Sequence, residues 1–160
     1  MTIQTGDKIP ACATLRVMGE KGPKAVTTNE LFDGKKVVLF AVPGAFTPGC
    51  SLTHLPGFVV KADEIKAKGV DSIICIAVND AFVMDAWGKT QNAEQLIMLA
   101  DGSGEFAKAM GLDLDLTDKG MGVRFKRMAM VVDDGTVTHL AIEPPGGIVV
   151  SSAEAILKVL

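Results

Sequence analysis

The chain has 160 residues, of which 48% are hydrophobic and 22% charged, with 19 acidic against 16 basic residues. This composition is too apolar for a disordered chain and lacks the basic excess of a nucleic-acid-binding protein, so we expect small molecules or proteins as partners. The length suits one domain, residues 1–160. No apolar run approaches the ~18 residues of a membrane span, and the first ten residues lack a signal-peptide pattern, so we expect a soluble protein of the cytoplasm.

The first elements in chain order are short. Residues 15–18 and 24–26 predict a small hairpin around "GEKGP", and Thr27 with Glu30 predicts a capped one-turn helix. The run "KKVVLFAV" at residues 35–42 is continuously apolar and β-branched, which is typical of a strand buried on both faces. After Cys50, apolar residues at three- and four-residue spacing predict an amphipathic helix that ends at Gly69 and is kinked by Pro56.

Strand and helix patterns continue to alternate. A second buried strand is predicted at residues 70–78, which completes a βαβ unit and puts the Cys50 loop at a carboxyl end of the sheet. Asp80 is the predicted cap of a helix that carries, on one face, Phe82, Val83, Ala86 and Trp87. Residues 96–100 predict a strand, and Ser103 opens a short helix that ends at Gly111.

The last elements are a hairpin and a helix. Residues 127–142 predict two strands joined by an Asp134-Gly135 turn, and Ser151 with Glu154 predicts a capping box for the final helix. The whole pattern indicates the α/β class, with a mixed central sheet, a parallel core and helices on both faces. Sites in such sheets gather at the carboxyl ends of strands.

The segment "VPGAFTPGC" places a cysteine in such a position. Thr47 and Pro48 are preferred residues at the cap and first position of a helix, which would make Cys50 the third residue of the first turn. Unpaired N–H groups and the helix dipole there favour a thiolate. Most free cysteines are small core residues, but the Gly, Pro and Thr around Cys50 favour a reactive nucleophile at the lip of the strand.

The loop "PGAFTPGC" resembles the PxxxTxxC active-site loop of the peroxiredoxins, which are thiol peroxidases with a thioredoxin-like fold. The resemblance extends over nearly the whole chain. The matching segments include "CSLTHLPGF", "VDSIICIAVNDAFVMDAW", "LADGSGEFAKAMGL" and "KRMAMVVDDG". Together these segments resemble the type II, or Prx5-like, subgroup. It implies a thioredoxin-like fold with an N-terminal β-hairpin extension and no prosthetic cofactor.

The resemblance also implies residue roles. Cys50 would be the peroxidatic cysteine, Thr47 would hydrogen-bond the thiolate and the peroxide, and Pro43 would shield the pocket from water. Arg127 would be the active-site arginine. From the sequence alone Arg124 competes for that role, and the register of Arg127 before the "MAMVV" strand favours Arg127. Donors of this kind stabilise the negative charge that builds on the departing oxygen.

The other two of the three cysteines bear on how oxidised Cys50 would be reduced again to complete a peroxidase cycle. None of the three forms a CxxC pair, so no disulfide framework is expected. Cys75 lies inside a strand, so a Cys50–Cys75 disulfide would need backbone movement, and Cys75 is kept as the alternative resolving cysteine. Cys12 has no feature that suggests activation. The late loop "GGIVVSSAEAIL" lacks the resolving cysteine of animal Prx5 relatives.

The favoured interpretation is therefore a one-cysteine peroxidase for hydrogen peroxide and alkyl hydroperoxides. By the resemblance, glutathione with glutaredoxin is the expected external donor, ahead of thioredoxin. A homodimer through the faces flanking the loop would bring Phe46 near a partner, whereas in a monomer Phe46 would close the pocket. The alternative function is a redox-regulated sensor or binding protein that uses Cys50 without efficient turnover.

His54 raises two further alternatives. It follows Cys50 by four residues, so the two side chains share a helical face, as in a Cys–His hydrolase dyad or a metal-binding pair. Zinc would need two more ligands, and a hydrolase would need a residue that orients His54. The sequence supplies neither, so neither site is expected.

Overall fold

The computed structural model describes residues 1–160. Its strands are β1 (Arg16–Gly19), β2 (Gly22–Ala25), β3 (Lys36–Ala41), β4 (Ser72–Ala77), β5 (Ile97–Ala100), β6 (Asp113–Leu116), β7 (Gly122–Phe125), β8 (Met128–Asp133) and β9 (Thr136–Ile142). Its helices are α1 (Thr28–Phe32), η1 (Cys50–His54), α2 (Leu55–Ala67), α3 (Ala81–Thr90), α4 (Glu105–Met110), η2 (Thr117–Lys119) and α5 (Ala153–Leu157). No helix has the length and apolar content that a membrane crossing requires.

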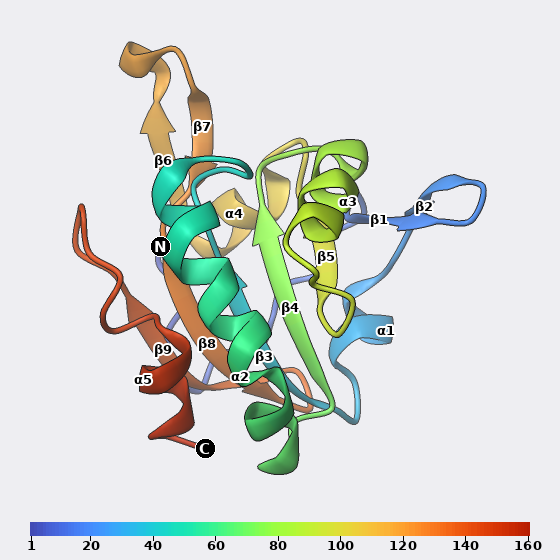
Figure 1. Ribbon diagram of the computed structural model, residues 1–160, viewed down its shortest axis with the longest axis vertical. Coiled ribbons are helices and arrows are strands. Elements are labelled where there is room, and N and C mark those ends of the chain that lie inside the picture. The colour runs from blue at the N-terminus through green and yellow to red at the C-terminus, as the bar shows by residue number, and fades with distance from the viewer.

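Seven of the strands form one mixed sheet in the order β2-β1-β5-β4-β3-β8-β9. β4 is parallel to both β3 and β5, whereas β8 pairs antiparallel with β3 and with β9. This is the predicted mixed sheet with a parallel core. The β1–β2 hairpin and a separate β6–β7 hairpin project from opposite sides of the body (Figure 1).

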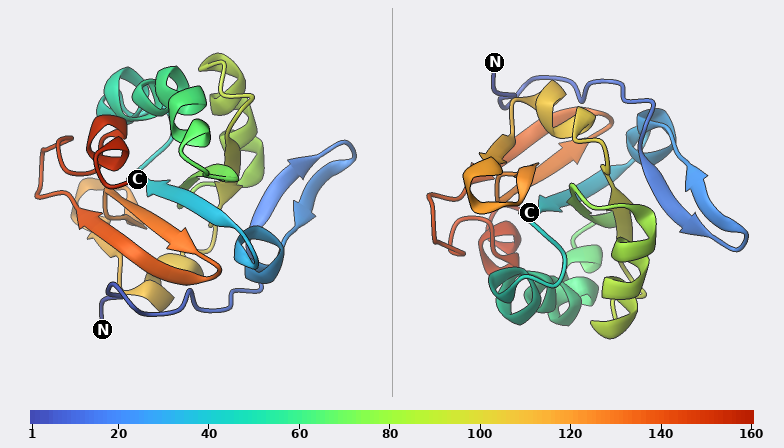
Figure 2. Two further views of the ribbon diagram at one scale, coloured as in Figure 1. Left: turned by 90° about the horizontal axis from the view of Figure 1, so that it is seen from below. Right: turned by 90° about the horizontal axis from the view of Figure 1, so that it is seen from above.

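The alternating side chains of the central strands divide between two cores. On β3, Val38 and Phe40 pack with α2, α3 and α5, whereas Val37 and Leu39 pack with α1 and α4. Successive residues of a strand point to opposite faces, so a continuous apolar run is what a sheet covered on both sides requires. Figure 2 shows these two helical layers on either side of the sheet.

Several local predictions are confirmed. The Asp134-Gly135 turn joins β8 to β9 with both residues at positive φ, 48° and 79°, which is the geometry that favours this dipeptide. Thr27 caps α1 by accepting from the Glu30 N–H, and Asp80 caps α3 by accepting from the Val83 N–H.

Other local predictions are wrong. The cap of α5 is Ser152, whose side chain accepts from the Ala155 N–H, while Ser151 is fully buried. α4 follows Gly104, which serves as its cap in place of Ser103.

Two predictions concern the longer helices, and the second of them is wrong. Pro56 stands in the first turn of α2, directly after the π-helical turn Cys50–His54, so it lies within one continuous helical segment to which it supplies no N–H. The face of α3 that packs inward carries Ala81, Met84 and Trp87, which leaves Phe82 63% exposed.

Candidate active site

The loop after β3 ends in a helical turn, and this turn carries Cys50. Helical backbone begins at Pro48, and the Ser51 N–H closes the first turn on the Thr47 carbonyl at 2.9 Å. Cys50 is therefore the third helical residue, as the sequence predicts. The N–H of Cys50 has no acceptor within the protein, so it is free to donate to a bound oxygen. Residues Cys50–His54 form a π-helical turn, a feature frequent at functional sites.

Two side chains hold the Cys50 sulfur. The Thr47 Oγ1 lies 2.9 Å from Cys50 Sγ, and the Arg127 Nη2 lies 3.2 Å from it. Cys50 is fully buried and belongs to the core cluster that includes α2 and β4. The predicted position of Cys50 after the carboxyl end of β3 is confirmed, but the expectation that its thiol is not a buried one is wrong, because the first helical turn packs its third residue inward, under the guanidinium group.

The Thr47 hydroxyl has two acceptors and one proton. Its Oγ1 lies 2.6 Å from the Gly44 carbonyl oxygen as well as 2.9 Å from Cys50 Sγ. With a protonated thiol, the hydroxyl can donate to Gly44 and accept from the S–H; with a thiolate, it can donate to the sulfur. The same hydroxyl can therefore serve both protonation states of Cys50.

Arg127 is the arginine that reaches the thiol. Arg124, the competing candidate, instead donates to the carbonyl oxygens of Met121 at 2.8 Å and Pro43 at 3.5 Å. Arg124 lies on β7 and Arg127 in the two-residue junction before β8, and of the two only Arg127 contacts Cys50. The Pro43 ring lies beside Arg127 along one groove at the entrance to the loop.

His54 orients Arg127, a contact that the sequence interpretation missed. The Arg127 Nη1 donates to His54 Nδ1 at 2.9 Å, which leaves the proton of the ring on Nε2, 2.8 Å from the Ser151 carbonyl oxygen. Burial lowers the pKa of His54 from 6.5 to about 4, and the nearby Arg127 charge lowers it too, so the ring is neutral at pH 7. Both nitrogens are used, so His54 is neither a base for Cys50 nor a metal ligand here.

Glu143 fixes the loop that holds His54. Its carboxylate, only 9% exposed, accepts from three successive backbone N–H groups at Val149, Val150 and Ser151 and from the Ser151 hydroxyl. Burial raises the pKa of Glu143, but the hydrogen bonds from these residues outweigh burial and hold the pKa below its ordinary value. A continuous network thus runs from Glu143 through Ser151, His54 and Arg127 to the Cys50 sulfur.

The other two cysteines occupy different places. Cys75 is fully buried in β4, in the same core cluster as Cys50, and both are free thiols. Burial raises the pKa of Cys75 well above its ordinary value, and the nearby Cys50 sulfur raises it further. Cys12 is half-buried against the opposite core, on the other face of the sheet.

The combination of sheet, helix start and sulfur contacts defines a class of protein. A cysteine at the first turn of a helix, at the carboxyl end of a parallel strand and held by a cation and a hydroxyl, is suited to nucleophilic attack by a thiolate. On a mixed sheet covered by helices, this arrangement is that of a thioredoxin-like enzyme that works through a thiol.

Comparison with known proteins gives the family. The family model described as Redoxin matches residues 4–157. The chain is 50% identical to Peroxiredoxin-2D of Arabidopsis thaliana over 160 residues, covering 99% of this chain and 98% of that protein. The crystal structure of reduced Prx3 from Vibrio vulnificus in complex with hydrogen peroxide superposes with a TM-score of 0.94 at 53% identity, covering 99% of both chains.

A peroxiredoxin structure of lower sequence identity also matches the chain. The crystal structure of peroxiredoxin 5 from Alvinella pompejana matches with a TM-score of 0.84 at 37% identity, covering 98% of this chain and 96% of that one. The chain belongs to the Redoxin family and, within it, to the peroxiredoxins, which are thiol-dependent peroxidases without a prosthetic cofactor.

Proposed function

We propose that Cys50 is the peroxidatic cysteine of a one-cysteine peroxidase that an external thiol recycles. The observation that carries the proposal is the pair of donors, Thr47 and Arg127, within 3.2 Å of Cys50 Sγ. Both donors stabilise a sulfur anion, and both can follow charge that moves to a bound peroxide.

The peroxidase step forms an S–O bond and breaks an O–O bond. The Cys50 thiolate attacks the terminal oxygen of ROOH, and the electron pair of the O–O bond leaves with the RO group, which takes up a proton as ROH. Sulfur is oxidised to sulfenic acid, and the peroxide is reduced to an alcohol or to water. Arg127 and the free Cys50 N–H are placed to stabilise the departing oxygen, while Pro43 limits the access of water to the same space.

Recycling by an external thiol is supported by the places of the other cysteines. Cys75 has the raised pKa of a buried thiol inside a strand, so its thiolate is scarce and its backbone is fixed by both neighbouring strands. Cys12 packs on the opposite face of the sheet from Cys50. A disulfide from Cys50 to either would require the sheet or the first turn of the helix to rearrange. We therefore keep Cys75 only as the alternative resolving cysteine.

The donor and the assembly are part of the same proposal. Resemblance to the type II subgroup favours glutathione with glutaredoxin as the donor, ahead of thioredoxin. A homodimer is supported by exposed rings on adjoining segments: Phe46 is 53% and Phe82 is 63% exposed, and the Ala45 N–H binds Asn79 Oδ1 at 2.9 Å. A reducing compartment such as the cytoplasm suits three free thiols.

The test is peroxide-dependent turnover by the wild type and by a Cys12→Ser/Cys75→Ala double variant. Each is supplied in parallel with glutathione plus glutaredoxin or with thioredoxin, and Cys50→Ser is the inactive control. Turnover by the double variant with glutathione and glutaredoxin supports the proposal. Turnover by the wild type alone would make an internal disulfide part of the cycle. Oxidation of Cys50 without turnover by either protein would favour a redox sensor.

A further inference from the structure

The turn that leads into Cys50 contains the one bulky residue of the chain with a positive φ. Phe46 has a φ of 65°, whereas the other two non-glycine residues at positive φ are Asn92 and Asp134, whose residue types tolerate this conformation. A bulky side chain with a Cβ is strained there. Strain of this kind persists only where the surrounding structure holds it, and it is concentrated at functional sites. Phe46 must therefore be held by its surroundings.

Phe46 is the third residue of a β-turn, residues 44–47. The Thr47 N–H donates to the Gly44 carbonyl oxygen at 3.4 Å and closes the turn. A turn with positive φ at its third residue ordinarily takes Gly or Asn there. The same Gly44 oxygen lies 2.6 Å from Thr47 Oγ1, which in turn lies 2.9 Å from Cys50 Sγ. The turn thus places the Thr47 hydroxyl between the Gly44 carbonyl and the reactive sulfur.

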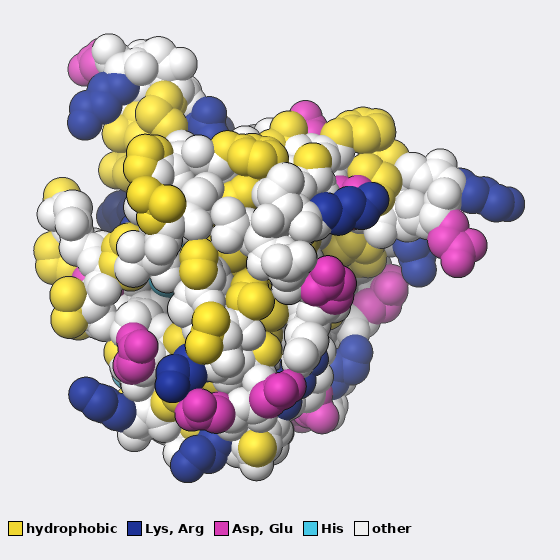
Figure 3. Space-filling model, in the orientation of Figure 1, with side chains coloured by type: hydrophobic (Ala, Val, Ile, Leu, Met, Phe, Trp, Pro, Cys, Tyr) yellow, Lys and Arg dark blue, Asp and Glu magenta, His cyan; other side chains and the backbone are white.

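The ring of Phe46 gives a reason for a residue other than glycine in this turn. Its centroid lies 6.4 Å from that of the Trp87 ring, while Phe46 stays 53% exposed. Hydrophobic side chains gather over α3 and the start of α2, along the upper edge of the molecule in Figure 3. Glycine would adopt the backbone conformation without strain, but it would remove the ring from this surface.

One side chain from outside the loop holds the turn. Asn79 lies two residues after β4, and its Oδ1 accepts from the Ala45 N–H at 2.9 Å. Ala45 is the second residue of the turn. The turn closes through its first and last residues, so the Ala45 N–H needs an acceptor from elsewhere. Because β4 is parallel to β3, Asn79 joins the carboxyl ends of two neighbouring strands, across 34 positions of sequence.

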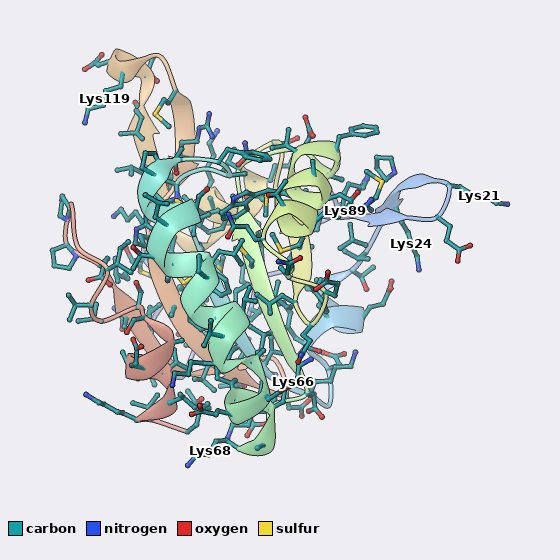
Figure 4. The ribbon with its side chains drawn as sticks, in the orientation of Figure 1. Lys21, Lys24, Lys66, Lys68, Lys89 and Lys119 are labelled. Atoms are coloured by element: carbon teal, nitrogen blue, oxygen red, sulfur yellow. The ribbon has the colours of Figure 1, made fainter.

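Asn79 is itself held in a well-ordered segment. The next residue, Asp80, caps α3 by accepting from the Val83 N–H at 2.9 Å. Farther along the helix, Lys89 lies on the exposed side (Figure 4) and pairs with Asp85 at 3.0 Å. The Asn79 side chain therefore extends from the fixed junction between a central strand and a capped helix, and it can restrain the turn that it contacts.

We propose that Asn79 is a positioning residue for peroxide reduction, which holds the strained turn in the form that directs the Thr47 hydroxyl to Cys50. The inference rests on the proposed peroxidase function of Cys50. Asn79 donates nothing to the sulfur, whose hydrogen bonds come from Thr47 and Arg127, so it acts through the turn and through Thr47. Without the acceptor, the Ala45 N–H is left unpaired, and the turn can relax to negative φ and withdraw the hydroxyl from the sulfur.

The test measures the second-order rate constant for oxidation of Cys50 by hydrogen peroxide in a Cys12→Ser/Cys75→Ala background, which leaves one thiol. Acid quench and alkylation of the denatured protein give the fraction of Cys50 that is not oxidised. We expect Asn79→Ala to lower the rate constant about tenfold, the order expected when a partly buried N–H loses its acceptor. Asn79→Asp keeps an oxygen acceptor and should lose less than about threefold. Asn29→Ala, at an exposed position of α1, is the matched control and should lose nothing.

Two double variants show whether Asn79 acts through the turn. In a Thr47→Val background the hydroxyl is absent, so Asn79→Ala should cost less than about a further twofold. In a Phe46→Gly background the turn adopts positive φ without strain, so the cost of Asn79→Ala should fall below about threefold. Phe46→Leu is the control for this background. It removes the ring but keeps a Cβ at positive φ, so the full loss should persist.

Four results would overturn the inference. They are an unchanged rate in Asn79→Ala, an equal loss in Asn79→Asp, and an undiminished loss in either the Thr47→Val or the Phe46→Gly background. Circular dichroism spectra check that each variant is folded. If Asn79→Ala does not fold, Asn79→Ser, whose side chain is shorter, replaces it in every comparison. Failure of hydrogen peroxide to oxidise Cys50 in the background protein would instead refute the proposed function.

Discussion

Arg127 is held between two partners: its Nη1 donates to His54 Nδ1 at 2.9 Å, while its Nη2 lies 3.2 Å from Cys50 Sγ. The two nitrogens of one planar group thus join a buried neutral imidazole to the reactive sulfur. Arg127 directly precedes β8, and the contact with His54 orients its guanidinium group; four of the predictions below follow from the groups around it.

Replacement of Arg127 by lysine is expected to be nearly as damaging as replacement by alanine. A lysine ammonium is a single point and cannot meet both His54 and Cys50 in the geometry of the guanidinium fork. Loss of a donor to developing negative charge costs about 10²–10³-fold in rate. Stopped-flow rates of Cys50 oxidation by hydrogen peroxide would measure the loss. Arg124→Lys is the matched control, and an equal loss in that variant would contradict the assignment.

His54→Leu should slow peroxide reduction by roughly tenfold, because Arg127 loses the acceptor that orients it. His54→Asn keeps an oxygen acceptor near the place of Nδ1 and should recover part of the rate. The diagnostic measurement is the rate constant for oxidation of Cys50 by hydrogen peroxide at pH 7. Equal rates in both variants would show that His54 serves packing alone.

Acid should destabilise the protein through His54. The folded state keeps this ring neutral down to a pH of about 4, whereas the unfolded chain protonates it near 6.5. The unfolded state then binds more protons in this window, so the free energy of unfolding falls as pH drops from 6.5 to 4, by up to about 3 kcal/mol. Urea titrations at several pH values would measure the fall.

His54→Gln provides the comparison for this titration. The variant lacks the titrating ring but keeps Glu143, whose lowered pKa contributes its own loss of stability at acid pH. The difference between the two pH profiles therefore isolates His54. Parallel profiles between pH 6.5 and 4 would contradict the prediction.

The Thr47 hydroxyl should matter more than its methyl group. Thr47→Ser keeps a donor to Cys50 Sγ, whereas Thr47→Val removes it and leaves a nearly equal volume. We expect Thr47→Val to lose about 100-fold in the rate of Cys50 oxidation and Thr47→Ser to lose far less. Comparable losses in the two variants, with native spectra, would mean that the side chain acts through packing.

Oxidation of Cys50 should change the fluorescence of Trp87, the only tryptophan in the chain. The Trp87 Nε1–H donates to the Oγ of Ser51, the residue that follows Cys50, at 2.9 Å. The centroids of the Trp87 and Phe46 rings are 6.4 Å apart. A shift of the first helical turn on sulfenic acid formation would break or lengthen the hydrogen bond. Stopped-flow emission after addition of hydrogen peroxide tests this, with Cys50→Ser as the silent control.

The sequence predicted the parts of the fold that local patterns encode. The buried runs on β3 and β4, the Asp134-Gly135 turn and the caps Thr27 and Asp80 all depend on neighbours a few residues away. The β6–β7 hairpin was not predicted, because "DLDLTDKGMGVRF" has alternating charges and joins its strands through a 3₁₀ turn at Thr117–Lys119 without a two-residue turn signal.

The same distinction applies to the site. Pro43, Thr47 and Cys50 form one local motif, so their proximity follows from a short segment. The contacts of His54 with Arg127 and with Ser151 join residues 73 and 97 positions apart, and no local pattern reports them. The mistaken choice of Ser151 as helix cap has the same origin, since its hydroxyl is used by Glu143 across the loop.

Because Cys50 is completely buried, the oxidation step and the reduction step of the cycle differ in the size of the molecule that must reach the sulfur. A peroxide oxygen is about the size of a water molecule, so only a small movement beside Pro43 and Arg127 is needed to admit it to the sulfur. The sulfur of a reducing thiol must approach opposite the new S–O bond, with its own carbon attached, so the first turn of the helix has to open before reduction. At high reductant concentration the turnover rate should therefore reach a plateau set by that opening. A second peroxide that arrives before the helix opens meets the sulfenic acid in the closed site and can oxidise it further. The extent of irreversible inactivation should therefore depend on the rate of helix opening relative to the rate at which peroxide arrives.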